Sequence, residues 1–195
     1  DSLKGEGITR AMLWPGAGVG GHCLTKDTYH LERGVQVLGK DDLDFPKGEP
    51  SLYVLARRIN DFMPTHMFRL TKDALSRAGR PVKGAKIALL GWSFLANSDD
   101  TRNTPAEPYR GLLVKEGAVV SVQDPYVAEY PGVAMVPFVE EALEGADAMV
   151  IFAGHHQYHT LNPRVLKNLS GKMHPVIIDG RNFVDPDGYI REGFV

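Results

Sequence analysis

The sequence predicts an α/β protein in which a helical segment precedes a Rossmann-like parallel sheet. From Ala85 onward, short apolar runs alternate with amphipathic stretches, the pattern of strands joined by helices in a doubly wound sheet. Upstream, apolar residues recur at helical spacing over residues 51–79. The stretch "GRPVKG" (79–84) separates the two patterns and divides the chain into two predicted domains, 1–80 and 81–195.

The second domain begins with "KIALLGW" (86–92), an apolar run typical of a strand buried on both faces. Thr104 and Pro105 predict the N-cap and first position of a helix that ends at Gly117. Further strands are expected over 118–124, 147–154 and 175–180, with helices over "VEEALEGA" and "PRVLKNL". Ligands of such sheets bind beyond the carboxyl ends of the strands, so we expect the site there.

Residues 51–79 predict a long helix with Ser51 as its N-cap and Gly79 as its end. Pro64 falls inside this pattern and predicts a kink or two abutting helices. Because little sequence precedes the helix, we expect its apolar stripe to be buried against a second copy of the chain, forming a homodimer. The alternative is that it packs on the sheet domain alone.

Composition limits the classes of protein to consider. The 195 residues are 43% hydrophobic and 24% charged, with a net charge of −2. Lys and Arg form no cluster that predicts a nucleic-acid partner, and no apolar run reaches the about 18 residues of a membrane helix. A single cysteine cannot form an internal disulfide, so we expect the reducing environment of the cytoplasm.

The stretch "WPGAGVGGHC" (14–23) permits two interpretations. Gly16, Gly18 and Gly21 match the G-x-G-x-x-G pattern of a dinucleotide-binding loop. Asp41 or Asp42 then stands about 20 residues further on, where a ribose-binding carboxylate belongs. That pattern also requires a buried strand before the first glycine, and "GITRAMLWP" is poorly suited to form one.

The second interpretation is a loop that presents a thiol. Cys23 falls at the start of a predicted helix, whose N-terminus stabilises a thiolate, and Lys26 adds positive charge. Asp27 follows Cys23 at i+4 on the same face, where it can orient a water. The alternative is that Cys23 is a small buried hydrophobic residue. His22 and His30 lack the ligand spacing of a metal site, so no metal is predicted.

Several sequence blocks resemble the nucleotide-sugar 6-dehydrogenases, the UDP-glucose and UDP-N-acetylhexosamine dehydrogenases. "PGAGVGGHCLTKD" resembles their catalytic segment, and "RRIND" with the following "MP" resembles the start of their central dimerisation helix. "GWSFLANSDDTRNTPAEPY", "VQDPYV" and "IIDGRN" resemble successive blocks of their UDP-binding domain. The blocks cover essentially the whole chain in the same order. "GGHC" with "FLANSDDTRNTPA" most resembles the UDP-N-acetyl-D-mannosamine dehydrogenase branch.

The resemblance implies a chemistry and a set of site residues. Cys23 would attack the C6 aldehyde formed by a first hydride transfer, and a second transfer would give a thioester that water hydrolyses with the help of Asp27. NAD would be the cofactor, approached by Lys26 and Arg102. The residues implied to pass close to the UDP-sugar are Leu13, Trp14, Pro15, Gly16 and Gly20.

Two departures from the family pattern are visible. The family's N-terminal NAD-binding domain is absent, together with the segment that carries its catalytic lysine and asparagine, so we expect this chain to be part of a longer enzyme and inactive alone. Leu95 stands where many members carry a substrate-contacting lysine. The alternatives are a UDP-glucose or UDP-N-acetylglucosamine dehydrogenase, or a non-catalytic nucleotide-sugar binding or dimerisation module.

Other polar residues at the predicted strand ends have two interpretations each. Asp124 caps the following turn or serves the site. His155 and His156 face the uracil pocket or solvent. Arg102 contacts the cofactor or is simply a salt-bridged loop residue. Arg181 and Asn182 contact the nucleotide or merely cap the turn after the last strand.

Overall fold

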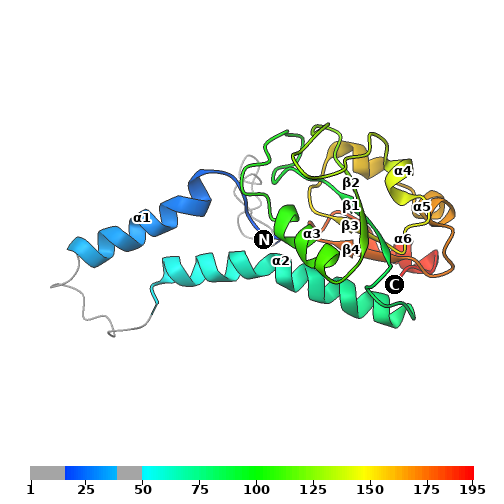
Figure 1. Ribbon diagram of the computed structural model, residues 1–195, viewed down its shortest axis with the longest axis horizontal. Coiled ribbons are helices and arrows are strands. Elements are labelled where there is room, and N and C mark those ends of the chain that lie inside the picture. The colour runs from blue at the N-terminus through cyan, green and yellow to red at the C-terminus, as the bar shows by residue number, and fades with distance from the viewer. Residues whose placement is uncertain (1–15, 39–49) are drawn as a thin grey trace, which may run out of the picture.

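The computed structural model describes residues 16–38 and 50–195. It has two parts, a parallel sheet with helices on both faces and a pair of helices that extends away from the sheet (Figure 1). This architecture confirms the predicted α/β fold. Among the described helices, none combines the length and the apolar character needed to cross a membrane.

The sheet has four parallel strands in the order β2-β1-β3-β4. Leu90, the last residue of β1, lies opposite Gln123 of β2 and Ile151 of β3, and Ile151 lies opposite Asp179 of β4. The carboxyl ends of all four strands therefore meet at one edge. The strands are β1 Lys86–Leu90, β2 Val119–Gln123, β3 Ala148–Ile151 and β4 Val176–Asp179.

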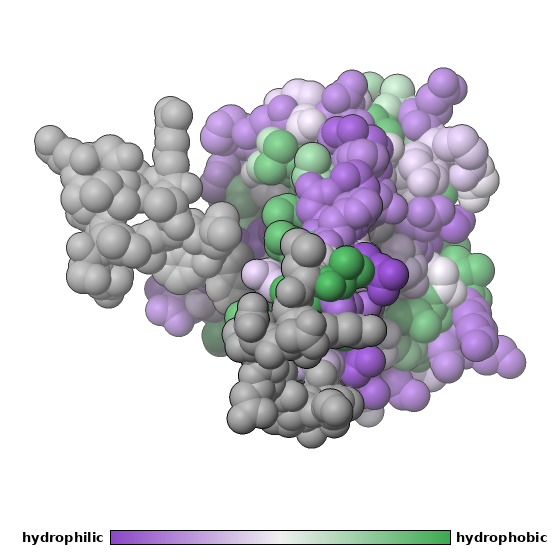
Figure 2. Space-filling view, turned by 90° about the vertical axis from the view of Figure 1, so that its left-hand side faces the viewer, coloured by the Kyte–Doolittle hydropathy of each residue, from purple (hydrophilic) through white to green (hydrophobic). Residues whose placement is uncertain are grey.

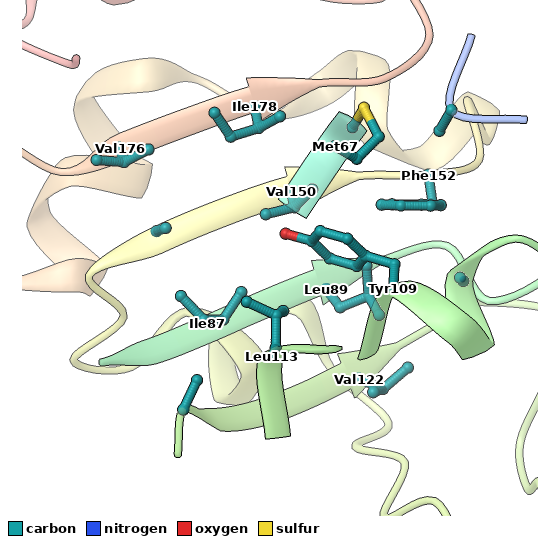
Figure 3. Close-up of a cluster of buried hydrophobic side chains, with 14 of the residues drawn as sticks. Met67, Ile87, Leu89, Tyr109, Leu113, Val122, Val150, Phe152, Val176 and Ile178 are labelled. Atoms are coloured by element: carbon teal, nitrogen blue, oxygen red, sulfur yellow. The ribbon is translucent and has the colours of Figure 1, made fainter. Parts of the chain in front are cut away.

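Helices cover both faces of this sheet. Side chains of α2 and α3 pack on one face, where Met67 and Tyr109 contact strand residues such as Val150 (Figure 3). Three helices, α4, α5 and α6, cover the other face through residues such as Leu143 and Leu166. The bounds are α2 Leu52–Arg77, α3 Ala106–Lys115, α4 Val139–Leu143, α5 Pro163–Ser170 and α6 Pro186–Arg191.

Helix α2 begins as the sequence predicts, because Ser51 is its N-cap and accepts a hydrogen bond from the N–H of Val54. The prediction of two abutting helices is wrong, since one helix continues through Pro64. The proline removes one backbone donor, but its side chain is buried and the helix continues on both sides of it.

The first half of α2 lies beside α1, which spans Cys23–Leu38, and we call α1 together with residues 52–62 the arm. The second half of α2 packs on the sheet domain through residues such as Leu75. Many apolar side chains of the arm remain exposed, and Figure 2, which faces this end of the molecule, shows green apolar patches among purple polar ones. The exposed set is Leu24, Tyr29, Leu31, Val35, Val37, Leu52, Tyr53, Leu55, Ile59 and Phe62.

Three local predictions need correction. Helix α3 starts at Ala106, not Pro105, and Pro105 takes the N-cap position that was expected for Thr104. The Thr104 hydroxyl still accepts from the N–H of Ala106 over 3.2 Å. The short helix α6 and the 3₁₀ turn η2, His156–Thr160, were not expected from the sequence.

Candidate active site at the carboxyl edge of the sheet

A glycine-rich loop, residues 16–22, lies across the carboxyl edge of the sheet and leads into α1. The backbone N–H of Ala17 donates to the carbonyl of Gly180, just after β4, over 2.9 Å. The N–H of Gly21 donates to the carbonyl of Arg102 over 2.7 Å. The loop is thus attached to two separate strand-end loops, at the edge where a doubly wound fold binds its ligands.

Two asparagine side chains complete this attachment. Asn60 of α2 accepts from the N–H of Val19 over 2.7 Å and donates to its carbonyl over 3.1 Å. Asn103 donates to the carbonyl of Gly21 over 3.0 Å. Helix α2 and the sheet domain therefore position the loop together. Neither asparagine was selected from the sequence, although both stand in the blocks that carry the family resemblance.

Close packing against Phe94 accounts for part of the glycine content of the loop. A Cβ added at Gly20 would lie 2.6 Å from the Cβ of Phe94, and one added at Gly21 would lie 2.8 Å from its ring. Gly21 also has a φ of +83°, which favours glycine. At Gly16 an added Cβ would lie 2.9 Å from the carbonyl oxygen of Gly180. The contacts of Gly16 and Gly20 with a UDP-sugar remain predictions.

Cys23 is the first residue of α1, and its side chain is exposed. The thiol therefore lies at a helix N-terminus, where free backbone N–H groups favour negative charge. The alternative in which Cys23 is a small buried hydrophobic residue is wrong, because α1 projects away from the sheet and leaves its first turn uncovered.

Lys26 and Asp27 pair with each other on the first turns of α1. The hydrogen bond from Lys26 lowers the pKa of Asp27, and the same bond raises the pKa of Lys26. Their side chains are 45% and 48% exposed, so both are accessible to a ligand. While this pair persists, Asp27 is a weak base.

Arg102 reaches the same region from the sheet domain. It forms the expected alternative salt bridge, with Asp100, over 2.6 Å. Hydrogen bonding to Asp100 raises the pKa of Arg102, and negative charge on Cys23 contributes in the same direction. Cys23 also contributes to the raised pKa of Lys26. Lys26 and Arg102 therefore bring positive charge toward Cys23 from two parts of the fold, α1 and the loop before α3.

The other strand-end residues have structural contacts. Asp124 accepts hydrogen bonds from the backbone of Tyr126 and Val127, which confirms that it caps the turn. Both interpretations of His155 as a pocket-facing or solvated side chain are wrong, because it is completely buried against Asp124. Arg181 donates to the carbonyls of Phe152 and Phe94, and its burial lowers its pKa.

Two open clefts flank the glycine-rich loop. One, of 360 Å³, is lined by residues of α1, α2 and the start of α3, including Thr25, Asn60 and Asn103. The other, of 400 Å³, opens beyond β4 between Gly16 and Asn182. Within the described ranges, no three His, Cys, Asp or Glu side chains are placed to hold a metal ion. The predicted residues Leu13, Trp14, Pro15, Asp41 and Asp42 lie outside those ranges.

Comparison with known proteins assigns the sheet domain to a family. Residues 88–186, just over half of the chain, match the UDP binding domain of the UDP-glucose/GDP-mannose dehydrogenase family. The chain belongs to this family. Its members include dehydrogenases that resemble this chain over nearly its whole length, as the following relatives show.

A solved NDP-N-acetyl-D-galactosaminuronic acid dehydrogenase from Methanosarcina mazei Go1 is 60% identical, with a TM-score of 0.91, covering 100% of this chain and 41% of that one. A UDP-N-acetyl-D-mannosamine dehydrogenase from Pyrococcus horikoshii is 36% identical over 182 residues, 92% of this chain and 39% of that protein. A solved UDP-D-ManNAc dehydrogenase from the same organism is 35% identical, with a TM-score of 0.71, covering 89% of this chain and 37% of that one. This chain thus spans about two-fifths of the length of these relatives.

In this chain, the loop between β1 and α3 contains Leu95, the residue that differs from the lysine of many family members. Leu95 is 53% exposed, and its backbone carbonyl accepts from the Ser93 hydroxyl over 2.9 Å. Phe94, the residue before it, packs over the glycine-rich loop, a contact that sequence reasoning missed. The sequence indicated Phe94 only by its place in "GWSF", directly after a predicted buried strand.

Proposed function

We propose that this chain is the UDP-sugar-binding and nucleophile-bearing part of an NAD-dependent UDP-N-acetyl-D-mannosamine 6-dehydrogenase. The observation that carries the proposal is the exposed Cys23 at the N-terminus of α1, on a loop bonded to the carboxyl edge of a UDP-binding domain. Lys26 and Arg102 add positive charge from two sides. The dehydrogenases among its relatives support the oxidoreductase class of this proposal.

Covalent capture is the role we assign to Cys23. Its thiolate adds to the carbonyl carbon of the C6 aldehyde produced by the first oxidation, forming a C–S bond. Oxidation of this thiohemiacetal gives a thioester, and water then adds to the thioester carbon and displaces the thiolate. NAD, when bound, accepts the hydride in each oxidation. The covalent bond keeps the aldehyde in the site between the two oxidations.

Lys26 and Arg102 fit an anionic cofactor, since both are exposed cations whose ion-pair partners among the described residues are the neighbouring carboxylates of Asp27 and Asp100. We assign them to the phosphates of NAD, which a further domain of the enzyme would also bind. A phosphate that attracts Lys26 would release Asp27 from its present partner. The pKa of Asp27 would then rise toward its ordinary value, which suits its proposed role in accepting a proton from the attacking water.

The test is Cys23→Ser in a full-length enzyme that contains this chain. We expect uronate formation to fall by at least about a thousandfold, because an alcohol is a far weaker nucleophile than a thiolate. Calorimetric titration with UDP should be unchanged, which would show that the variant is folded and binds nucleotide. Uronate production at the wild-type rate would exclude the nucleophile role.

The substrate has a second candidate, because the 60% identical structure acts in the N-acetyl-D-galactosamine series according to its name. Steady-state kcat/KM for the UDP derivatives of N-acetylmannosamine, N-acetylgalactosamine, N-acetylglucosamine and glucose would rank these substrates. The neutral Leu95 in an exposed loop favours an N-acetylated sugar, whose methyl group can contact an apolar side chain, over glucose. We therefore expect the Leu95→Lys variant to lose preference for acetamido sugars.

A non-catalytic binding or dimerisation module is the alternative from another class. The arm, with its exposed apolar side chains, supports assembly with a second copy in either case. The two classes differ in turnover: a module would bind UDP in calorimetry, yet the longer protein would produce no NADH with any UDP-sugar. NADH formation together with uronate formation that Cys23→Ser abolishes would exclude the module.

A further inference from the structure

A buried histidine lies at the point where the strand order of the sheet reverses. The chain passes from β1 outward to β2 and then returns to β3 on the other side of β1, so the carboxyl ends of β1 and β3 flank the switch point. His155 follows β3 there and is 0% exposed. The loop 92–97 follows β1 on the opposite side of that point.

The hydrogen bonds of His155 determine its tautomer. Its Nε2 lies 3.0 Å from Oδ2 of Asp124, and an ionised carboxylate can only accept, so Nε2 carries the proton. Its Nδ1 lies 2.9 Å from the backbone nitrogen of Asn97, which can only donate, so Nδ1 is bare. Burial would raise the pKa of Asp124, but the hydrogen bonds from His155 and from backbone N–H groups hold that pKa below its usual value.

These bonds connect His155 to the whole of the loop 92–97. Asp124 Oδ2 also accepts from the N–H groups of Trp92 and Ser93, over 2.7 and 2.9 Å, and so holds the start of the loop. Nδ1 of His155 holds its end at Asn97, which has a φ of +57°. The side chain of Asn97 returns to the strand-end segment by accepting from the N–H of His156 over 2.8 Å.

The same loop controls the position of the glycine-rich loop, because Phe94 lies between its two fixed ends. The Phe94 side chain fills the space that a Cβ at Gly20 or Gly21 would need. Gly21 is two residues before Cys23. A continuous set of contacts therefore leads from the buried imidazole, through loop 92–97, to the segment that presents the thiol.

We propose that His155 is a positioning residue: as the neutral Nε2–H tautomer, it holds loop 92–97 in the shape that UDP-sugar binding requires and, through Phe94, fixes the glycine-rich loop before Cys23. This role rests on the proposed function for its effect on the UDP-sugar. The geometry of the loop itself is independent of that function.

The first measurement is the tautomer. Long-range ¹H–¹⁵N spectra of the histidine rings in the chain should show His155 with a protonated Nε2 and a bare Nδ1 at neutral pH. A protonated Nδ1 would overturn the proposal, because the bond that holds Asn97 would not exist.

The second measurement separates positioning from simple support of the fold. Asparagine places its side-chain oxygen near the position of Nδ1, and glutamine places its amide nitrogen near that of Nε2. We therefore expect His155→Asn to retain the acceptor for Asn97 and to bind UDP within about threefold of the wild type. His155→Gln keeps only the bond to Asp124 and should weaken UDP binding about tenfold.

Hydrogen exchange at the Asn97 amide provides a readout that does not depend on UDP. It should accelerate at least about tenfold in His155→Gln and much less in His155→Asn. The control is His174→Asn, which removes an exposed histidine near the amino-terminal end of β4 and should change neither measurement. The melting temperature of each variant is measured as well. If UDP affinity and Asn97 exchange changed simply in proportion to the melting temperature, His155 would only support the fold, and the proposal would be overturned. If the wild type did not bind UDP at all, the proposed function would fail, while the tautomer and exchange data would still decide the role of His155.

Discussion

In the sheet domain, apolar side chains fill both faces of the sheet, whereas in the arm many of them remain at the surface. Helix α2 belongs to both regions and makes the contrast within one element. Leu75, near its end, is 0% exposed, while Leu52, at its start, is 75% exposed. Leucines that belong to one predicted helical pattern are thus buried in the second half of α2 and exposed in the first half.

The difference shows that periodicity predicts a helix and its apolar face but does not identify what covers that face. The sheet domain supplies its own cover, because helices from both halves of the chain reach it. Among the described residues, the helices of the arm pack mainly on each other, and apolar residues on both of them remain exposed. The sheet domain is therefore packed on both faces of its sheet, and the exposed apolar surface of the arm favours the predicted contact with a second copy.

The largest effect should come from equal truncations at the two ends of α2. Leu75→Ala removes a fully buried side chain and should lower the free energy of unfolding by about 3 kcal/mol. Leu55→Ala removes a side chain that is 44% exposed and should lower it by less than about 0.5 kcal/mol in the monomer. Urea denaturation measures both. Equal losses would contradict the division of α2 into a covered and an uncovered half.

Within the sheet domain, Asp124→Asn should lower the free energy of unfolding by about 2 kcal/mol, because buried N–H groups and His155 lose a charged acceptor. The lowered pKa of Asp124 in the fold means that its contribution is present above the ordinary pKa of the carboxyl and is lost as the pH falls through the folded pKa. Wild type and variant should therefore converge in stability in acid. Asp73→Asn, on the exposed surface of α2, is the control and should show no such convergence.

A charge in the arm should act on assembly instead of folding. Ile59 is 57% exposed, and Ile59→Glu should weaken self-association at least about tenfold by placing a charge in the interface that we predict. Sedimentation velocity over a concentration series gives the dissociation constant, with Lys115→Glu on α3 as a control outside the arm. A dissociation constant unchanged by Ile59→Glu would show that the arm is not the interface between copies.

The smallest effect should be local to the start of α2. Ser51→Ala removes the N-cap acceptor for the N–H of Val54 and should destabilise the first turn by about 1 kcal/mol. Hydrogen exchange at the Val54 amide should accelerate, while Ser51→Asp, which keeps an acceptor, should preserve the protection. Unchanged exchange in Ser51→Ala would mean that packing in the arm, and not the cap, holds this turn.

The regular elements could be predicted because each depends on local sequence. "KIALLGW" is apolar enough to be a strand buried on both faces, and Ser51 marks a helix start wherever that helix packs. The position of Cys23 at a helix N-terminus was likewise visible from the residues around it. The catalytic roles of Cys23 and Asp27 remain predictions.

The contacts that build the site could not be predicted, because they join distant segments. Nothing around His155 indicates that it would be buried against Asp124, since the pairing depends on the order of strands in the sheet. The glycines before Cys23 suggested space for a ligand, and at Gly20 the space is taken by Phe94. The hydrophobic periodicity and the composition of a sequence do not indicate which distant residues will pack together.

The uninterrupted course of α2 has a mechanical consequence. Its 26 residues extend roughly 39 Å at the rise of an α-helix, from the arm, where it lies beside α1, to one face of the sheet. A protein that binds the arm therefore also sets the direction in which the UDP-binding domain points. In a pair of molecules joined through their arms, one continuous helix in each would set the spacing and mutual orientation of the two sheet edges. Pro64 is the position along that helix where a bend costs least.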